Sequence, residues 1–492
     1  MTRKNISGSA LLVVMVIAAG SLMLPEDLCA FELNLHQTTT GGVNGTPFWL
    51  QANRWGLYSD SPLQGSLGME ASLDRDFGQH WNVELLADID GFMDDDGGDV
   101  RLRFGYGALS WRVFEVKGGM YPDIMGILPS PELSSGSMSV SGNARPLPKV
   151  QFAIPDWTTV PFTNDVLEIR GGLAHGWFLG ERAVDNVLLH EKWGYGRFGP
   201  QDGTKVYLGL VHQTMWGGSV QQANWDNYTR AFFGRDASED SSELGPAGNS
   251  VGMWDIGIEM PLERVDLHGY YHHYFELEHG IYFKNALDGL WGLGIDIPDT
   301  TYWPDTVVLE SLYTVYQGGR YHRLSQVLDD AGITQEPDQT FGIGGGAHQY
   351  YSHGIYLNGW THLDRIIGNP LIVATGSGDD LRIAGNRVNA YHVGLSGVVV
   401  ANIRYTGKLT FATYKPTRIG ARTYAPVSLV PEGETWVQTS FFVGLEIDNA
   451  FGREPLGLSL GFGADWGDVY DNTAGFELAV RYELIGGPRN PE

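Results

Sequence analysis

Hydrophobic and polar residues alternate along most of the chain from residue 46 onward. Within 476–484 the even positions are apolar, while Glu477, Arg481 and Glu483 stand between them. The segments 437–448, 401–411 and 100–107 follow the same rule, with apolar residues at every second position. A period of two is typical of β-strands that have one apolar and one polar face. The pattern therefore predicts an all-β fold.

Alternation alone does not say which face meets water. A β-sandwich or a propeller would bury the apolar face, whereas a membrane barrel turns it toward lipid. Three features favour the barrel. The runs reach about 8–11 residues, which suits a tilted strand crossing a bilayer. They recur without a repeating blade signature, and aromatic residues that would suit an interfacial girdle stand near their ends: Tyr106, Trp111, Trp436 and Tyr482.

Chain length sets the size of this barrel. A strand with its share of turn and loop takes about 20–25 residues in large barrels, which gives about 18 strands here. We predict a transmembrane antiparallel β-barrel that forms a single domain over residues 31–492, with its last strand ending near Ile485. Two stretches depart from the strand pattern. Residues 321–330 have the apolar spacing of a short helix, and residues 236–248 form a polar, acidic loop.

Residues 1–30 have the order of a secretory signal peptide. Arg3 and Lys4 precede an apolar run at 10–24, and a small residue stands before Phe31 as a cleavage point. The apolar run is too short to cross a bilayer as a helix. We predict export and removal of this segment. The single cysteine, Cys29, leaves with it, so the mature protein forms no disulfide.

Composition limits the function further. The formal net charge of −26 opposes nucleic-acid binding, which needs a basic face. With 67 Gly, 23 Tyr and 15 Trp, the chain is neither disordered nor a helix bundle. The zinc-protease motif and the phosphate loop are absent. We therefore expect no enzyme, no cofactor and no metal centre, although Ser and His from neighbouring strands could still meet.

Residues 143–148 cannot form a central strand, because two prolines remove hydrogen-bond donors. One interpretation is a loop folded into the barrel, in which Asn143 and Arg145 contact sugar hydroxyls or uronate carboxylates. The alternative is a rigid turn that Arg145 pins to a carboxylate of the lumen.

Residues 268–278 present His268, Tyr270, His272, Tyr274, Glu276 and Glu278 on one face. As a lumen wall, this face offers aromatic platforms and hydrogen-bond partners for carbohydrate. A metal site at His268 and His272 and a glycosidase pair at Glu276 and Glu278 are alternatives. However, residues two apart on a strand point in parallel, about 7 Å apart, whereas a glycosidase needs opposed carboxylates. A solvated polar wall is the simplest interpretation.

Residues 88–99 are rich in aspartate and superficially resemble a calcium loop. The EF-hand pattern fails, because an oxygen ligand is missing wherever the glycine is placed correctly. We interpret this stretch as an acidic hairpin loop, with a non-standard calcium site as the alternative.

A series of segments resembles the capsule assembly protein Wzi family, in the family's order and over about residues 46 to 400. Each segment is short, but the ordered set is specific. The segments are 46–56, 133–138, 141–148, Phe275-Glu276 with Gly280, 288–292, Tyr350-Tyr351 with 359–361, 367–371, and 386–388 with His392 and Gly394.

The resemblance implies an 18-stranded outer-membrane barrel with an obstructed lumen, which binds polysaccharide as a lectin does and neither catalyses nor conducts. Inward loops, and a short helix at 321–330, would obstruct this lumen. Together with the segments above, the resemblance gives these candidate polysaccharide contacts: Asn143, Arg145, Tyr270, His272, Tyr274, Glu276, Asp288, Trp291, Tyr350, Tyr351, Trp360, Asn386 and Arg387.

The expected partners are capsular or exopolysaccharide and outer-membrane lipid, with the protein as a monomer. Because an acidic protein repels an acidic polymer, we expect arginines or divalent cations to bridge the two. The alternative function is a porin-type channel for anionic or sugar solutes, with Arg101, Arg103, Arg404 and Lys408 on lumen faces.

Overall fold

The computed structural model describes residues 30–234, 248–276, 281–283, 285–298, 304–317, 349–417, 427–452 and 455–485. Three predicted features lie outside these residues: the signal peptide apart from its last residue, the helix at 321–330, and nearly all of the acidic loop at 236–248. Among the residues described, no helix is long and apolar enough to cross a membrane.

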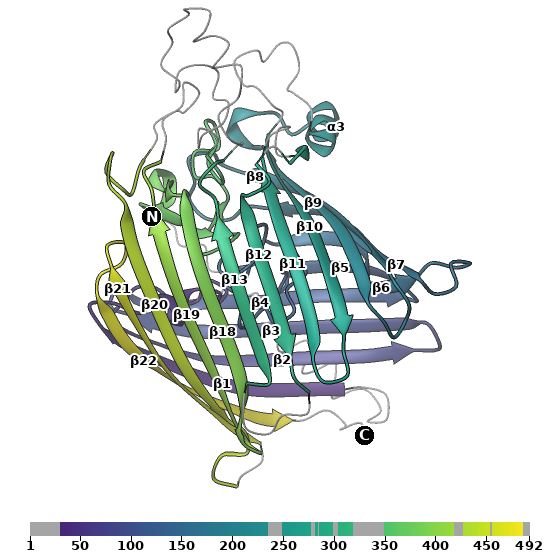
Figure 1. Ribbon diagram of the computed structural model, residues 1–492, viewed down its shortest axis with the longest axis horizontal. Helices are drawn as coiled ribbons and strands as arrows, with labels where there is room; N and C mark the ends of the chain where they lie inside the picture. The colour runs from purple at the N-terminus through teal and green to yellow at the C-terminus, as the bar shows by residue number, and fades with distance from the viewer. Residues whose placement is uncertain are drawn as a thin grey trace, which may run out of the picture.

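The strands of the wall form one 18-stranded sheet in which every pairing is antiparallel (Figure 1). The first strand pairs with the second and also with the last, so the sheet closes on itself and has no free edge. The predicted antiparallel barrel is confirmed. Its strands are β1 (Ala30–Val43), β2 (Leu63–Phe77), β3 (Trp81–Asp94), β4 (Gly97–Trp111), β5 (Phe114–Met120), β6 (Lys149–Thr159), β7 (Leu167–Trp177), β8 (Val187–Phe198), β9 (Lys205–Gly217), β10 (Asn249–Pro261), β11 (Asp266–Phe275), β12 (Gly289–Asp296), β13 (Thr306–Tyr313), β18 (Val388–Val400), β19 (Ile403–Tyr414), β20 (Trp436–Ile447), β21 (Leu456–Gly467) and β22 (Thr473–Ile485).

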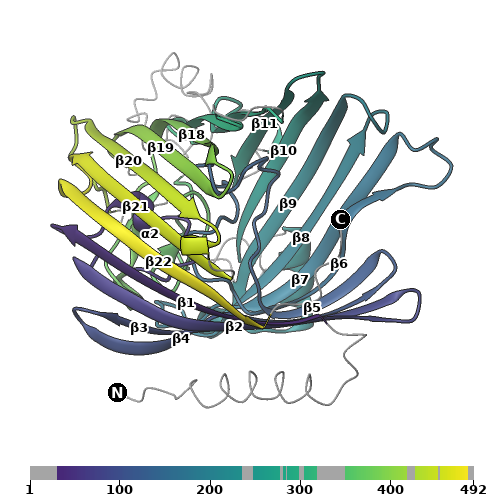
Figure 2. The same cartoon turned by 90° about the horizontal axis from the view of Figure 1, so that it is seen from below.

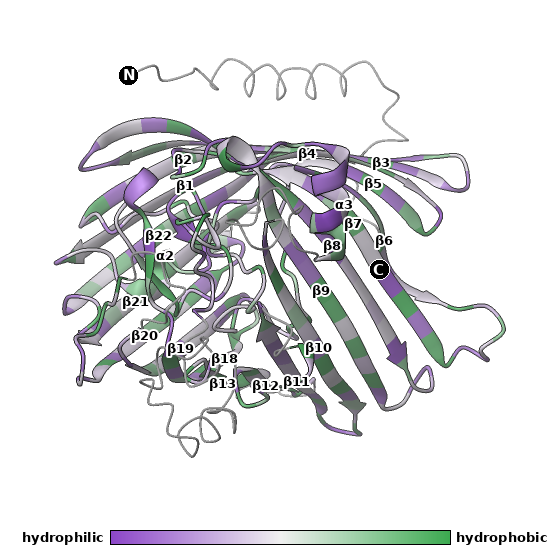
Figure 3. Cartoon of the chain, turned by 90° about the horizontal axis from the view of Figure 1, so that it is seen from above, coloured by the Kyte–Doolittle hydropathy of each residue, from purple (hydrophilic) through white to green (hydrophobic). Residues whose placement is uncertain are grey.

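The apolar face of these strands points outward. On β22, Phe476 is 55% exposed whereas Glu477 is 6% exposed and faces the lumen. On β19, Leu409 and Phe411 are exposed and Thr410 between them is buried. Figure 3 shows the resulting bands of opposite hydropathy along the strands. An outer surface covered with large apolar side chains, around a polar interior, is the arrangement of a barrel in lipid.

One strand departs from the predicted alternation. The pairing of β3 with β4 shifts by one residue at Arg103, which forms a β-bulge. Beyond the bulge the two faces exchange, because one extra residue turns every following side chain over. Phe104 and Tyr106 therefore point inward, where they contact the rings of Trp55 and Tyr121. The expectation that Tyr106 belongs to an outer aromatic girdle is wrong.

The connections between strands are unequal at the two ends of the barrel. Short turns, such as 78–80 and 112–113, lie at the end where β1 begins and β22 ends. The long connections 44–62 and 121–148 lie at the other end, as do the described parts of the connection from β13 to β18. In bacterial barrels short turns face the periplasm and long loops face outward, so we take the second end as the outer mouth.

The long connections fold back and fill the lumen. We call residues 44–62 the first loop, 121–148 the central loop, and 349–387 the long loop. The first loop carries the short helix α2 (Phe48–Gln51), which lies inside the ring of strands beside β20 and β21 (Figure 2). Large side chains of these loops, Trp49, Met138 and Trp360 among them, are fully buried in one cluster. The prediction of an obstructed lumen is confirmed.

The remaining elements are small. The long loop contains two short hairpins, β14 (Thr361–His362) with β15 (Arg365–Ile366) and β16 (Val373–Thr375) with β17 (Arg382–Gly385). The helix α3 (Trp225–Phe233) lies at the outer mouth (Figure 1). Three single turns of 3₁₀ helix complete the described elements: η2 (Gly218–Val220), η4 (Gly378–Asp380) and η5 (Ala450–Gly452).

Candidate functional site

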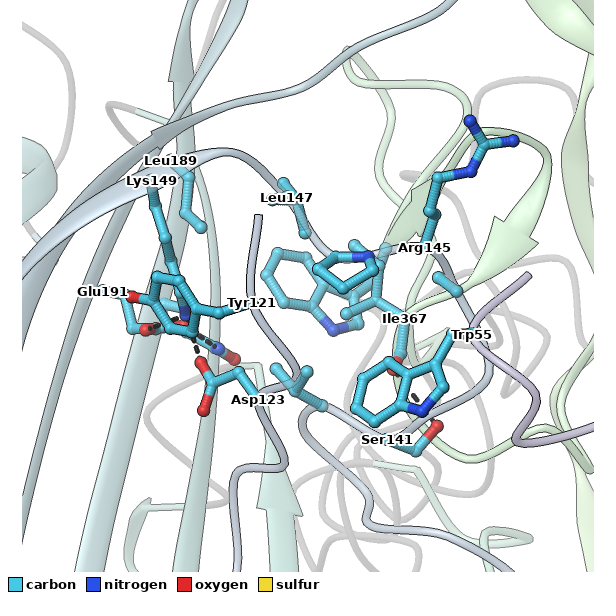
Figure 4. Close-up of a pocket in the computed structure, with 15 residues that line it drawn as sticks. Trp55, Tyr121, Asp123, Ser141, Arg145, Leu147, Lys149, Leu189, Glu191 and Ile367 are labelled. Atoms are coloured by element: carbon cyan, nitrogen blue, oxygen red, sulfur yellow. Dashed lines mark hydrogen bonds and ion pairs between the residues drawn. The ribbon is translucent and has the colours of Figure 1, made fainter. Parts of the chain in front are cut away.

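A buried polar chain ties the central loop to the barrel wall (Figure 4). Lys149 on β6 forms an ion pair with Asp123 of the loop, and its Nζ lies 2.7 Å from Glu191 Oε1 on β8. Gln213 on β9 donates to Glu191 Oε2 at 2.7 Å and accepts from Ser139 Oγ of the loop at 2.6 Å. Because each buried polar group here has a partner, the loop is held in one position.

Glu310 on β13 makes a second attachment for the same loop. Its Oε1 accepts hydrogen bonds from Ser134 Oγ and from Tyr270 Oη, each at 2.6 Å. Its Oε2 accepts from the backbone N–H of Ser135 at 2.7 Å. Three donors around one buried carboxylate satisfy most of its acceptor capacity, so this contact fixes the loop against the wall.

The loops are also bonded to one another. Trp360 Nε1 of the long loop donates to the Ser139 carbonyl at 2.7 Å. Asn143 Nδ2 of the central loop donates to the Ile366 carbonyl at 2.9 Å. The backbone N–H of Trp55 in the first loop donates to the carbonyl of Gly142. The three loops therefore form a single packed plug within the barrel.

Five of the candidate residues meet in one buried cluster between β11 and the long loop. Tyr274 Oη donates to Glu276 Oε1 at 2.8 Å, and the backbone N–H of Tyr351 donates to the same oxygen. Tyr350 Oη donates to Asp288 Oδ2 at 2.9 Å. Burial raises the pKa of Glu276 to about 8 and that of Asp288 to about 7. The structure brings these residues together, but their polar groups are hydrogen-bonded to one another.

Other candidates are likewise bonded within the plug. Asn386 Nδ2 donates to the Tyr350 carbonyl at 3.0 Å, and Arg387 Nη1 donates to the Pro416 carbonyl at 2.7 Å. His272 Nε2 lies 3.3 Å from the Ile127 carbonyl oxygen and 3.6 Å from Asp255 Oδ1.

The metal and glycosidase alternatives gain no support from the placement of their residues. His268 Nε2 lies 3.4 Å from Asp296 Oδ2, and within the described part of the chain His268 and His272 do not share a group of metal ligands. Glu278 lies outside the described residues.

Trp291 lies apart from the other candidates. Its ring is 44% exposed and stacks on Tyr271, with 3.8 Å between the centroids, on the outer face of the barrel. A side chain on the outer face of the wall cannot line the lumen, so Trp291 does not join the buried cluster of the other candidates, and its contact with polysaccharide stays a prediction. Successive side chains of a strand point to opposite faces, so His272 faces the lumen and its neighbour Tyr271 faces outward. Trp291 is the register partner of Tyr271 and shares its face.

Arg145 does not pair with a carboxylate of the described residues. Its guanidinium has no ion pair there, and its Nε is buried without a hydrogen bond. Burial lowers the pKa of Arg145 to about 10. The turn is held instead by Asn143 and by the Arg145 carbonyl, which accepts from His362 Nδ1 at 2.9 Å. Figure 4 shows the Arg145 guanidinium pointing away from Lys149 and Asp123, so the alternative of a pinned turn is wrong in its detail.

The basic residues expected on lumen faces are engaged. Arg101 donates to the Leu57 carbonyl at 2.8 Å, and Arg103 pairs with Asp90. At the other end Arg404 Nη2 lies 2.8 Å from Asp305 Oδ2, and Lys408 Nζ lies over the ring of Trp49. These four cations therefore stabilise the wall and the plug, and they do not line an open path.

The acidic stretch at 88–99 is mostly strand. Asp88 and Asp90 lie within β3 and are buried toward the lumen, while only residues 95 and 96 form the turn to β4. The expectation of an acidic hairpin loop therefore holds for the turn alone.

A cavity of about 350 Å³ opens at the outer mouth, where the first loop, the long loop and the β21–β22 connection meet. Its exposed rim carries the polar side chains of Asn44, Asp60, Asp364 and Asp471. Its apolar part includes Phe48, whose ring stacks on that of Tyr470 with 5.4 Å between the centroids. By contrast, the cavity drawn in Figure 4 holds only about 20 Å³.

Asp465 on β21 lines the larger cavity and is 1% exposed. Its Oδ2 accepts from the Phe48 N–H at 2.7 Å and from Thr473 Oγ1 at 2.8 Å. Its Oδ1 is buried and, within the described residues, accepts no hydrogen bond. An acceptor without a partner in a polar cavity is suited to a hydroxyl donor. Of the candidates named from sequence, only Asn143 lines this cavity. The rim aspartates are not among these candidates, because each one alone looks like an ordinary turn residue in the sequence.

Comparisons with known proteins agree with this architecture. The family model for the capsule assembly protein Wzi matches residues 38–374. The solved structure of Wzi from Escherichia coli, described as an outer-membrane carbohydrate-binding β-barrel involved in group 1 capsule assembly, is 17% identical with a TM-score of 0.55, and the match covers 96% of this chain and 88% of that one. OprD from Pseudomonas aeruginosa is 10% identical with a TM-score of 0.46, over 93% of this chain and 96% of that one. Curated protein sequences give no match. The family model covers more than half of the chain, which therefore belongs to the capsule assembly protein Wzi family of outer-membrane β-barrels.

Proposed function

We propose that this protein holds capsular or other exopolysaccharide at the cell surface by binding it, without catalysis, at the outer mouth of a closed barrel. The observation that carries the proposal is the packed plug with a polar cavity above it. A lumen filled by three interlocked loops has no room for a diffusing solute, so the chemistry open to solvent lies at the outer end. Membership of the Wzi family, and the carbohydrate binding reported for the Escherichia coli protein, support the same conclusion.

The outer cavity has the size and lining for a sugar unit. Its volume of about 350 Å³ falls within the range of small-molecule sites. The carboxylates of Asp60, Asp465 and Asp471 accept hydrogen bonds only, which suits the paired hydroxyls of a sugar ring. Phe48 and Tyr470 supply an apolar face. Because the rim is acidic, we propose a neutral sugar as the unit bound there.

Arg145 supplies the complementary charge for an acidic unit of the polymer. Its guanidinium has no ion pair within the described residues, and guanidinium binds carboxylate in a bidentate geometry. Many weak contacts along one polymer add up through multivalency, so each site needs only modest affinity. We propose that the protein acts as a monomer in the outer membrane, with divalent cations assisting where acidic groups of polymer and protein meet.

Deletion of the gene tests the proposal. We expect total polysaccharide to stay unchanged while the cell-bound fraction falls and the fraction in the medium rises, because synthesis does not need a surface binder. Re-expression of the wild-type protein restores the bound fraction, whereas expression of an unrelated barrel gives the matched control. Unchanged cell-bound polysaccharide in the deletion strain would overturn the proposal. Shortened or degraded chains that depend on the protein would show a hydrolase instead.

A further inference from the structure

A histidine and two aspartates converge on the lumen side of the first three strands. His36 on β1, Gly68 on β2 and Asp90 on β3 are register partners in one row across the sheet. Asp88 stands two residues before Asp90, on the same face. His36 Nε2 lies 3.0 Å from Asp90 Oδ1 and 3.5 Å from Asp88 Oδ1. Within the described residues, this is the one group of three His, Cys, Asp or Glu side chains whose ligand atoms all lie within 4.8 Å of one another.

Gly68 makes the convergence possible. A Cβ atom at this position would lie 2.1 Å from His36 Nε2 and 2.7 Å from Asp90 Oδ1. The imidazole therefore crosses the middle strand through space that any other residue would fill. Such a glycine within a strand marks the close approach of another group.

Arg103 orders the two carboxylates. Its Nε lies 3.1 Å from Asp90 Oδ2 and 3.4 Å from Asp88 Oδ2. The guanidinium Nε thus contacts both Oδ2 atoms, and its Nη2 also donates to Asp90 Oδ1 at 3.4 Å, while Asp88 Oδ1 is directed at His36. Asp88 is 1% exposed, and its Oδ1 accepts no hydrogen bond within the described residues. A buried acceptor without a hydrogen bond, aimed at an imidazole nitrogen, indicates that a further group belongs between them.

We propose that His36 Nε2, Asp88 Oδ1 and Asp90 Oδ1 bind one divalent transition-metal ion of the zinc class. In a tetrahedral zinc site with metal–ligand distances near 2.0–2.2 Å, neighbouring ligand atoms lie about 3.3 Å apart. The observed separations of 3.0 and 3.5 Å bracket that value.

The ligand types and their surroundings fit the same ion. An imidazole ligand selects zinc over calcium or magnesium, which prefer oxygen alone. His36 is 17% exposed toward the lumen, so water reaches the fourth position. Arg103, hydrogen-bonded behind the carboxylates, orients them as outer partners of metal ligands do.

Binding requires one proton to move. His36 Nε2 now shares a hydrogen bond with Asp90, and the metal takes the place of the Nε2 proton, which leaves or shifts to Nδ1. The two carboxylates then balance the charge of the ion. The bound ion joins β1 to β3 across β2, beside the seam at which β1 closes on β22. This site replaces the calcium loop considered for residues 88–99.

Metal titration of the detergent-extracted protein tests the proposal. After removal of metal with a chelator, Zn²⁺ is titrated calorimetrically, and Co²⁺ is added as a spectroscopic probe of tetrahedral coordination. We expect one equivalent of Zn²⁺ to bind. We expect Asp88→Asn and Asp90→Asn, which keep the side-chain shape, to lose this equivalent. The matched control, His268→Ala, removes a lumen histidine that lies beside a single aspartate and keeps full binding.

A second variant separates the site from the fold. Gly68→Ala keeps every ligand but fills the space in front of His36, so we expect at least a tenfold loss of affinity. Heat-modifiable migration in gel electrophoresis verifies that each variant forms the barrel. The proposal is overturned if the wild-type protein binds no zinc. It is also overturned if folded Asp88→Asn and Asp90→Asn variants bind zinc as the wild-type protein does; the cluster is then an ion-pair network alone.

Discussion

Replacement of Glu310 by alanine tests how the barrel is kept closed. The change removes the carboxylate that accepts from Ser134, Ser135 and Tyr270. Hydrogen bonds to a charged group contribute about 1.5–3 kcal/mol each, so three amount to about 4.5–9 kcal/mol gross. Loss of the buried charge also relieves a desolvation cost of several kcal/mol. We estimate a net loss of about 3 kcal/mol in docking of the central loop.

A loss of this size raises the undocked population of the loop by about a hundredfold, since 1.4 kcal/mol corresponds to a factor of ten. We expect the wild-type protein to be silent in planar bilayers and Glu310→Ala to show transient channel openings. Glu259→Ala is the matched control, because Glu259 is another lumen glutamate and its partner Arg197 belongs to the wall. Steady open-pore currents from the wild-type protein, or a Glu310→Ala variant as silent as Glu259→Ala, would refute this account of the plug.

Two further predictions concern the plug and the lipid face. Burial raises the pKa of Glu276 from its ordinary 4.5 to about 8, so its contribution to docking of the long loop is complete below pH 4.5 and is lost as pH rises through about 8. Hydrogen exchange of the long-loop amides, corrected for the intrinsic rate, should become faster as pH rises over that range. In Glu276→Gln the corrected exchange rate should depend less on pH, and an equal pH dependence in both proteins would contradict the role of Glu276. Fluorophores on single cysteines at Leu409, Thr410 and Tyr106 should be quenched by brominated acyl chains only at Leu409, because the other two side chains face inward. Quenching at Tyr106 would contradict the inward direction that the bulge gives this side chain.

The wall of the barrel could be predicted where alternation is regular. The segments 437–448 and 476–484 carry a clean period of two, and they form β20 and β22. The prolines at 146 and 148 likewise exclude a central strand, and of the two interpretations that the sequence leaves open, the structure contains the inward loop. In these cases the signal is local, because each residue's environment follows from its neighbours in the chain.

Other features depend on contacts that the sequence does not display. The sequence does not predict β1, because glutamine and threonine at 37–40 weaken its alternation. This strand is recognised only through its pairing with β2 and β22. The bulge at Arg103 reverses two faces with a single residue and leaves no mark in composition. Tyr350 and Asp288 are both candidate polysaccharide contacts in the sequence, but only the structure shows that the Tyr350 hydroxyl donates to the Asp288 carboxylate.

The outer cavity illustrates the same limit for the site. Asp60, Asp364 and Asp471 come from three connections that are distant in sequence, and each alone has the chemistry of a surface turn. Their meeting follows from barrel closure, which places the first loop beside the last connection. The candidate residues chosen from sequence therefore describe the framework beneath the cavity better than its rim.

Direct binding of the source polysaccharide by the detergent-extracted protein tests the central claim. We expect the wild-type protein to bind fragments of the polymer in a glycan array and by calorimetry. Loss of two rim carboxylates in the Asp60→Ala/Asp471→Ala variant should weaken binding about fivefold or more, at about 0.5–1.5 kcal/mol for each hydrogen bond. Asp202→Ala, which changes an exposed aspartate at the periplasmic end, should bind as the wild-type protein does. Absence of binding by the wild-type protein, or equal binding by the rim variant, would contradict the account.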